Sequence, residues 1–237
     1  MQMRFLGSAI ALAGALAPLG AHAKPARNLT MADITEVGTH NTYKAATSPE
    51  TIARLRQQSE KAAMAKDYAH RPVKDQLEAG ARAFEFDVNY DPEGGHFARI
   101  SADPRLQKPG FKVMHIPGID DNTNCLLLVE CLRDIRIWSD AHPDHAPILI
   151  MFNSMDEQNA ASGGFDALPF NEAAYDALDR EVLAVFGPEK IITPAQVQGT
   201  YATLRDAVLA HNWPGLDKAR GKVFCSATIT ESGALPQ

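Results

Sequence analysis

Short apolar runs alternate with longer amphipathic segments along most of the chain. Five runs are typical of β-strands, at residues 33–37, 81–88, 111–115, 147–152 and 222–225. Apolar positions recur at helical spacing in residues 49–65, 73–79, 125–141, 171–186 and 203–211. Strands that alternate with helices predict βαβ units and a parallel sheet with right-handed crossovers.

The pattern favours a single α/β domain of the (β/α)-barrel type over residues 24–237. No internal repeat, low-complexity tract or clear linker divides this region. An eight-stranded barrel usually takes about 250 residues. This region has 214 residues, and only five strands are predicted in it. Either the barrel is compact, or the chain ends before the barrel closes.

Residues 1–23 have the pattern of a secretory signal peptide. Arg4 supplies a positive charge, residues 5–19 are almost all apolar or small, and Ala21 and Ala23 are small where a signal peptidase cleaves. The apolar run is short for a transmembrane span. We expect cleavage after Ala23, rather than a retained anchor, and a secreted or periplasmic protein.

The charge balance narrows the choice of partners. Without Arg4 the chain has 22 Lys and Arg residues against 29 Asp and Glu residues. This excess of acid disfavours broad contact with a nucleic-acid backbone, so we expect no nucleic-acid partner. A phosphate-bearing substrate remains compatible, because a bound metal ion can invert the local field.

Export would permit disulfide bonds, and the chain has three cysteines. Cys125 and Cys131 are close enough in sequence to close a small loop, which leaves Cys225 without a partner. The alternative is three free cysteines, two of them at helical positions in the core.

Polar residues suited to catalysis gather at or near the ends of the predicted strands. In a (β/α) barrel, the loops after the strands build the active face, so these side chains are expected at one rim. A single histidine at a strand end is usually an ordinary solvated residue, and two acidic residues in a strand can form an ordinary polar face. The candidates come from four successive strands: His40, Asn41, Glu85, Asp87, His115 and Asn153.

The carboxylates of Glu85 and Asp87 predict a metal site. They are two residues apart, so they point to the same side of their strand, which is inward in a barrel. Burying two unpaired carboxylates is costly, and a cation removes that cost. Carboxylate and amide oxygens suit Ca²⁺ or Mg²⁺ better than zinc.

Several segments together resemble the calcium-dependent phosphoinositide-specific phospholipase C family, most closely its secreted bacterial branch. The resemblance runs from about residue 34 to residue 224. It rests on VGTHNTY at 37–43, DQLEAGARAFEFDV at 75–88, VMH at 113–115, the segment between Cys125 and Cys131, and WSDAHP at 138–143.

This resemblance implies a (β/α) barrel that cleaves the phosphodiester of phosphatidylinositol lipids, with contact to a membrane surface. The inositol 2-hydroxyl attacks phosphorus and diacylglycerol leaves. His40 matches the histidine that stabilises charge in the transition state, and His115 matches the one that protonates the leaving alkoxide. Asn41, Glu85 and Asp87 match calcium ligands, and Asp87 or a neighbour helps to deprotonate the nucleophile. The number of subunits is left open.

The sequence departs from the family pattern in two places. Asn153 stands where the family has a glutamate ligand to calcium. The asparagine amide keeps an oxygen that can bind calcium but lacks the negative charge of the glutamate. The family also continues beyond the strand at residues 221–224 with further strands. We therefore expect the C-terminal strands of the barrel to be missing from this chain.

Two other functions are kept as alternatives. A glycerophosphodiester phosphodiesterase shares the barrel and a Glu-x-Asp strand, but opens with His-Arg where this chain has His40 and Asn41. A non-catalytic or vestigial phosphoinositide- or metal-binding protein would be consistent with Asn153 and with missing strands.

Overall fold

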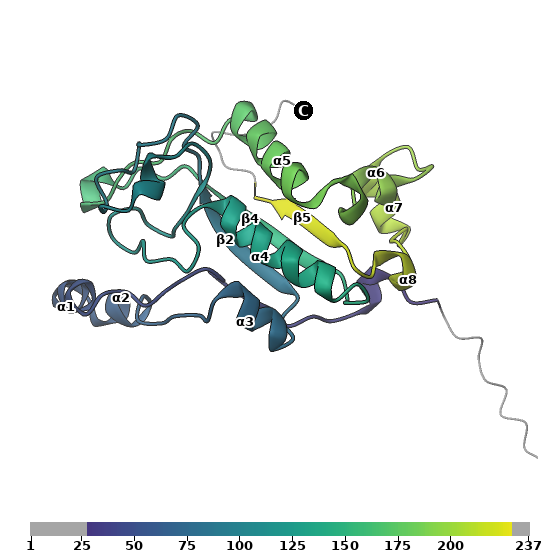
Figure 1. Cartoon of the computed structure of the whole chain (residues 1–237), viewed down its shortest axis with the longest axis horizontal. Helices are drawn as coiled ribbons and strands as arrows, with labels where there is room; N and C mark the ends of the chain where they lie inside the picture. Colours follow the sequence, from purple (N-terminus) through teal and green to yellow (C-terminus); the bar gives the residue numbers. More distant parts are fainter. Residues whose placement is uncertain (1–27, 229–237) are drawn as a thin grey trace, which may run out of the picture.

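A mainly parallel sheet forms the centre of the molecule in the computed structural model, which describes residues 28–228 (Figure 1). Four strands are parallel and lie in the order β1-β2-β4-β5, and β3 pairs antiparallel with β2. The strands are β1 (Gly38–Thr39), β2 (Ala83–Asn89), β3 (Lys112–Val113), β4 (Ile148–Met155) and β5 (Val223–Ala227). The predicted signal peptide lies outside the described residues.

Helices follow the parallel strands, as βαβ units require. Helix α4 lies across the sheet in Figure 1, with α3 and α5 on either side of it. The helices are α1 (Pro49–Gln58), α2 (Glu60–Met64), α3 (Val73–Glu78), α4 (Leu128–Ala141), α5 (Glu172–Phe186), α6 (Pro194–Gln198), α7 (Leu204–Leu209) and α8 (Leu216–Ala219). Short 3-10 turns lie at η1 (Met31–Asp33), η2 (Pro104–Gln107), η3 (Ala160–Ser162) and η4 (Pro188–Lys190).

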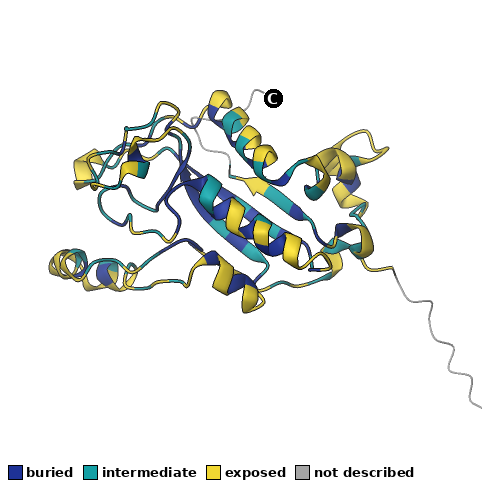
Figure 2. Ribbon diagram, viewed as in Figure 1, coloured by how far each residue is buried: buried dark blue, intermediate teal, exposed yellow. Residues whose placement is uncertain are grey.

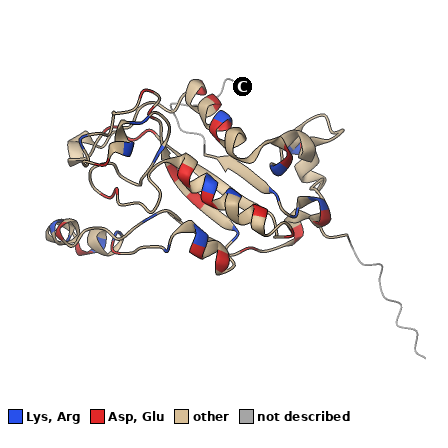
Figure 3. Cartoon of the chain, in the orientation of Figure 1, with Lys and Arg blue, Asp and Glu red and all other residues tan. Residues whose placement is uncertain are grey.

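Within residues 28–228, the helices α3, α4 and α5 cover one face of the sheet, and this face contains the main core. Phe84, Phe86 and Val88 of β2 pack there, against the apolar sides of α3, α4 and α5. The outward side of α4 is exposed in Figure 2, whereas the strands beneath it are buried. In the view of Figure 3, acidic and basic residues are interspersed along these helices. No helix among residues 28–228 combines the length and the apolar character needed to span a membrane.

The prediction for the first strand was wrong in position. Residues 34–37 belong to no strand, although the Val37 carbonyl accepts from the Arg82 N–H at 2.9 Å, and the strand begins at Gly38. A Cβ at Gly38 would lie 2.7 Å from the Cβ of Ala83. The glycine therefore permits the close approach of β1 to β2, and this approach fixes where pairing starts.

The predicted helix over residues 49–65 is divided in two at Ser59. This residue is extended, and its hydroxyl accepts a hydrogen bond from the Ala62 backbone N–H, which caps α2. Ser48 caps α1 in the same way, through the Thr51 N–H. Serine competes for backbone groups in this manner, so it ends helices as readily as it starts them.

The third predicted strand is not a barrel strand. β3 has two residues and runs antiparallel to β2, with Val113 opposite Val88. No α-helix lies between β2 and β3, only the turn η2, and a chain without a crossover helix folds back antiparallel. The buried Lys112 of β3 forms an ion pair with Asp91 at 3.0 Å.

The remaining predictions of elements are close to the structure. β4 continues to Met155, three residues beyond its predicted end, so Asn153 lies within the strand and not after it. Helices α3 and α5 match their predicted segments, whereas α4 begins only at Leu128 and α7 is shorter than residues 203–211. The short helices α6 and α8 were not predicted.

Cys125 and Cys131 form the predicted disulfide, with their Cα atoms 5.5 Å apart, and Cys225 is free. The bridge ties the loop before α4 to the second turn of that helix, and both cysteines belong to the main core.

We expect replacement of both Cys125 and Cys131 by alanine to lower the free energy of unfolding by about 2 kcal/mol, because a short closed loop is released in the unfolded chain. Urea unfolding with and without reductant measures this loss. Cys225→Ala is the matched control, and its unfolding should remain sensitive to reductant. Equal stability of the wild-type chain in both conditions would contradict the expectation.

Candidate active site

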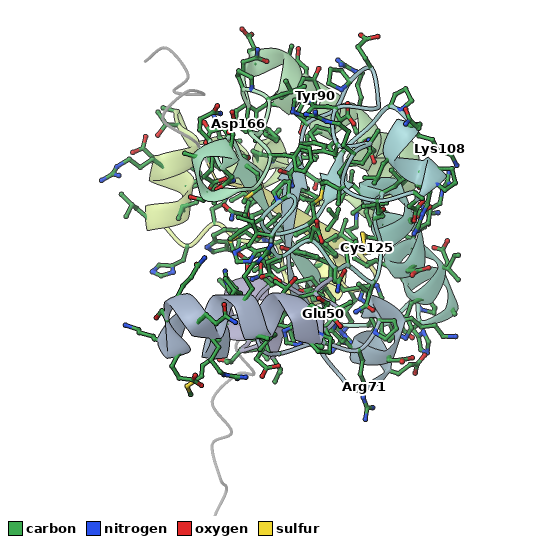
Figure 4. The ribbon with its side chains drawn as sticks, turned by 90° about the vertical axis from the view of Figure 1, so that its left-hand side faces the viewer. Glu50, Arg71, Tyr90, Lys108, Cys125 and Asp166 are labelled. Carbon is green, nitrogen blue, oxygen red and sulfur yellow. A yellow bond between two sulfur atoms is a disulfide. The ribbon has the colours of Figure 1, made fainter. Side chains whose placement is uncertain are left out.

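The predicted site residues lie at the carboxyl ends of β1, β2 and β4. The loops that follow these strands extend to the left in Figure 1, and Figure 4 looks onto this end of the molecule. Glu50 of α1 lies below Cys125 and Tyr90 in that view, so α1 borders the same end. The side chains of Glu85 and Asp87 alternate with those of Phe84, Phe86 and Val88, and lie on the face of β2 opposite the helices.

His40 and Asn41 form the turn that leaves β1. Asn41 has a left-handed backbone (φ 50°), which asparagine tolerates better than most residues. Its backbone N–H donates to Glu85 Oε2 at 3.0 Å, and His40 Nε2 lies 3.6 Å from the same oxygen. The His40 side chain is 75% exposed and borders a cavity of about 340 Å³ on the open face of the sheet, together with Glu85 and Met151.

Asp87 is the centre of a buried hydrogen-bonded cluster. Tyr43 donates its hydroxyl to Asp87 Oδ2 at 2.7 Å, and Asn153 Nδ2 donates to Asp87 Oδ1 at 3.0 Å. Thr228 in turn donates to Asn153 Oδ1 at 3.2 Å. Burial raises the pKa of Asp87 and exceeds the lowering effect of these donors.

The Asn41 side chain joins the same cluster. Its Nδ2 donates to the Tyr68 hydroxyl at 2.8 Å, and its Oδ1 lies 3.1 Å from the Tyr43 hydroxyl, which also contacts Asp87. Burial raises the pKa of both tyrosines, so both phenols remain protonated and can donate. Asn41, Asp87 and Asn153 are therefore linked through hydrogen bonds within one site.

His115 is paired with a separate carboxylate near this cluster. Its Nδ1 is 2.9 Å from Asp120 Oδ2 and 3.2 Å from Lys66 Nζ, and its side chain is 24% exposed. The positive charge of His115 is among the causes that lower the pKa of Asp87, so the imidazole is close enough to act on that carboxylate. The structure thus brings all six predicted residues to one end of the sheet.

Sequence reasoning missed a second group of polar residues behind His115. Asp120 is buried, forms an ion pair with the buried Lys44, and accepts a hydrogen bond from Thr47 at 2.9 Å. Lys44 directly follows the His40–Tyr43 segment, so its place beside the predicted site could have been inferred from the sequence. Asp120 lies in a loop with no periodic pattern, and the Lys44 and Thr47 side chains that hold its carboxylate are more than 70 residues away in sequence.

The oxygen atoms at this site fit a hard divalent cation. The donors are the carboxylates of Glu85 and Asp87 and the amide oxygens of Asn41 and Asn153, a set that suits Ca²⁺. Residues 28–228 contain no cluster of three or more His, Cys, Asp or Glu side chains arranged for a metal, so both amides are needed. The amide of Asn153 would have to turn, because its Nδ2 now faces Asp87.

The fold and the site define a class of protein. It is an α/β protein of the (β/α)-barrel type, with an open sheet in the described residues and two imidazoles, each beside a carboxylate, at the carboxyl ends of the strands.

Comparisons identify the family. The family model for phosphoinositide phospholipase C, Ca²⁺-dependent, matches residues 29–232. The chain therefore belongs to this family, and the family dependence on calcium agrees with the predicted cofactor. A search of curated proteins gave no match.

Solved structures show the same fold. A Ca²⁺-dependent phosphatidylinositol-specific phospholipase C from Streptomyces antibioticus is 22% identical with a TM-score of 0.53, over 88% of this chain and 57% of that one. A calcium-dependent phosphoinositol-specific phospholipase C from a Pseudomonas species is 20% identical with a TM-score of 0.53, over 85% of this chain and 59% of that one. The myo-inositol complex of the Pseudomonas protein is 20% identical with a TM-score of 0.52, over 84% and 58% of the two chains. The predicted fold class is confirmed, and the chain spans less than two thirds of the length of these structures.

We expect Lys44→Met to lower the free energy of unfolding by about 3 kcal/mol, because the buried Asp120 carboxylate would lose its compensating charge. Denaturant unfolding measures the loss. The double variant Lys44→Met with Asp120→Asn is the control, since it removes both charges and should recover much of the stability. Equal losses in the single and double variants would show that the ion pair is not the cause.

Proposed function

We propose that this chain is a calcium-dependent phosphodiesterase that cleaves phosphatidylinositol-type phosphodiesters with His40 and His115. The observation that carries the proposal is the placement of two imidazoles at one end of the sheet, each beside a carboxylate and near the buried oxygen atoms of the Asp87 cluster. Glu85 lies next to His40, and Asp120 lies next to His115. Membership of the phosphoinositide phospholipase C family supports the choice of substrate.

Each residue has a role in this proposal. Asn41, Glu85, Asp87 and Asn153 would hold Ca²⁺, which when bound stabilises the charge that develops on the phosphoryl oxygens. His40 lies at the exposed mouth of the site, where a protonated imidazole stabilises negative charge on the substrate. His115 donates a proton to the leaving oxygen, as a general acid does.

Asn153 sets how strongly the cation is held. Its amide now satisfies an Asp87 oxygen, and a cation would have to replace that hydrogen bond. Asn153 also brings no charge, so the ligands carry only the two negative charges of Glu85 and Asp87. We infer that the chain binds calcium weakly and that the site is filled only where calcium is abundant. The pattern of residues 1–23 supports export to such a compartment.

Turnover of phosphatidylinositol in mixed micelles by the purified chain tests the proposal. We expect release of soluble inositol phosphate with added calcium and none with chelator. His115→Ala should reduce kcat about 10²-fold or more, the usual contribution of a general acid. The control is His211→Asn, because His211 is an exposed histidine with a left-handed backbone that asparagine tolerates.

Absence of calcium-dependent turnover together with specific binding of phosphatidylinositol would support the second candidate, a binding protein without catalysis. The hydrogen bond from Asn153 to Asp87 favours that candidate, because it satisfies the buried carboxylate without a cation. Hydrolysis of glycerophosphocholine in preference to phosphatidylinositol would contradict both.

We expect Asn153→Asp to raise calcium affinity about tenfold, because affinity at oxygen sites rises with the charge of the ligands. The same variant should melt at a lower temperature in chelator, since two carboxylates would then face each other without a donor. Isothermal titration calorimetry and thermal melts measure the two effects. Asn153→Ala is the control and should bind calcium more weakly than the wild-type chain. Equal calcium affinity in all three proteins would place the cation elsewhere.

A further inference from the structure

Asp120 is a buried carboxylate in the loop between β3 and α4, five residues after His115. Its side chain is fully inaccessible to solvent, and each of its oxygens has a separate partner. Oδ1 accepts from the Lys44 ammonium and the Thr47 hydroxyl, and Oδ2 faces His115 Nδ1 at 2.9 Å. The carboxylate is thus fixed on one side by two donors and presented to the imidazole on the other.

The charges around His115 decide whether Nδ1 of its ring carries a hydrogen. Burial by itself would raise the pKa of Asp120, but the hydrogen bonds from His115, Lys44 and Thr47 and the charge of Lys44 lower it to about 2. Asp120 is therefore ionised at any working pH, and an ionised carboxylate only accepts hydrogen bonds. A bare Nδ1 would face a negative oxygen without a proton between them, so Nδ1 carries hydrogen and donates it to Asp120.

Two other charged groups face the same imidazole. Lys66 Nζ lies 3.2 Å from His115 Nδ1 and 3.9 Å from Asp120 Oδ2, and burial lowers the pKa of this lysine. Asp87 is the other, and the charge of His115 lowers the pKa of its carboxyl group. Asp120 Oδ2 is the closest of these groups to Nδ1. A lysine ammonium cannot accept a hydrogen bond, so Asp120 is the acceptor for the ring N–H.

We propose that Asp120 is a positioning residue for His115, fixing the ring so that Nε2 faces the leaving oxygen of the substrate. This inference rests on the proposed phosphodiesterase function. In the step, the oxygen of the inositol 2-hydroxyl forms a bond to phosphorus and loses its proton to Asp87 or a neighbouring carboxylate. The bond between phosphorus and the leaving oxygen breaks, and that oxygen takes the proton from Nε2. The electron pair of the N–H bond remains on Nε2, the ring becomes neutral, and the hydrogen on Nδ1 stays in its bond to Asp120. Lys44 and Thr47 act one step further back, by holding the carboxylate.

Asp120→Asn tests the proposal, because it keeps the shape of the side chain and removes its charge. We expect kcat on phosphatidylinositol to fall about 10²-fold with KM changed less than about threefold, since general acid catalysis is worth roughly 10²–10⁴-fold. The alkaline limb of the pH–rate profile should move to lower pH, because the protonated ring loses its anionic partner. The matched control is Asp121→Asn, which changes the adjacent carboxylate, one that accepts from the Gly118 N–H and has no contact with His115.

A double-variant cycle separates positioning from a general loss of structure. In a chain that already carries His115→Ala, Asp120→Asn should cost less than about threefold further, because its effect passes through the imidazole. An additional loss as large as in the wild-type background would overturn the proposal. So would an Asp120→Asn chain with wild-type kcat and an unmoved alkaline limb.

A readout without turnover keeps this inference distinct from the proposed function. Nitrogen-15 NMR of the His115 ring should show hydrogen on Nδ1 in the neutral wild-type imidazole, and loss of this single tautomer in Asp120→Asn. An inactive chain with the expected tautomer would reject the phosphodiesterase and retain the pairing, whereas a neutral ring with hydrogen on Nε2 would reject the pairing. If Asp120→Asn does not fold, Thr47→Val is the second variant, because it removes one of the two donors that hold the carboxylate. We expect it to move the alkaline limb of the pH–rate profile by a smaller amount. An unmoved alkaline limb would count against the proposal.

Discussion

The strict alternation of side chains along β2 is the constraint on which the rest of the structure depends. Phe84, Phe86 and Val88 are buried under the helices, which forces Glu85 and Asp87 onto the opposite face. A shift of one residue in the register of β2 would place both carboxylates in the apolar core. The hydrophobic core and the oxygen-lined site are therefore fixed by the same strand and cannot be varied independently.

The register between β2 and β4 extends this constraint to a second strand. Asp87 lies opposite Asn153, so the amide of Asn153 is held beside a buried carboxylate. A carboxylate in that position needs a donor or a cation, because burial alone disfavours its ionised form. The amide supplies the donor, and Tyr43 supplies another. Both Asp87 oxygens therefore have hydrogen-bond donors from the protein, and any cation must compete with these hydrogen bonds.

The sequence predicted those parts of the fold and site that follow from local periodicity. The alternation in residues 81–88 indicated which side chains of β2 share a face, and the helical spacing in residues 171–186 indicated α5. The predictions were wrong where contacts between residues far apart in the chain determine the structure. The place where β1 starts depends on the approach of Gly38 to Ala83, and the direction of β3 depends on the absence of a crossover helix. Asp120 was missed because Lys44 and Thr47, which hold its carboxylate, lie more than 70 residues away along the chain.

The two histidines differ in how firmly they are held, and the difference agrees with the separate roles proposed for them. His115 is mostly buried and faces a carboxylate that two other side chains anchor, so its ring has one favoured orientation. His40 is largely exposed, and its ring is 3.6 Å from Glu85, beyond hydrogen-bond length. Proton donation depends on distance and direction to one atom, whereas stabilising a diffuse negative charge requires only a nearby positive group. A firmly held imidazole and a more exposed one therefore suit the separate roles proposed for His115 and His40.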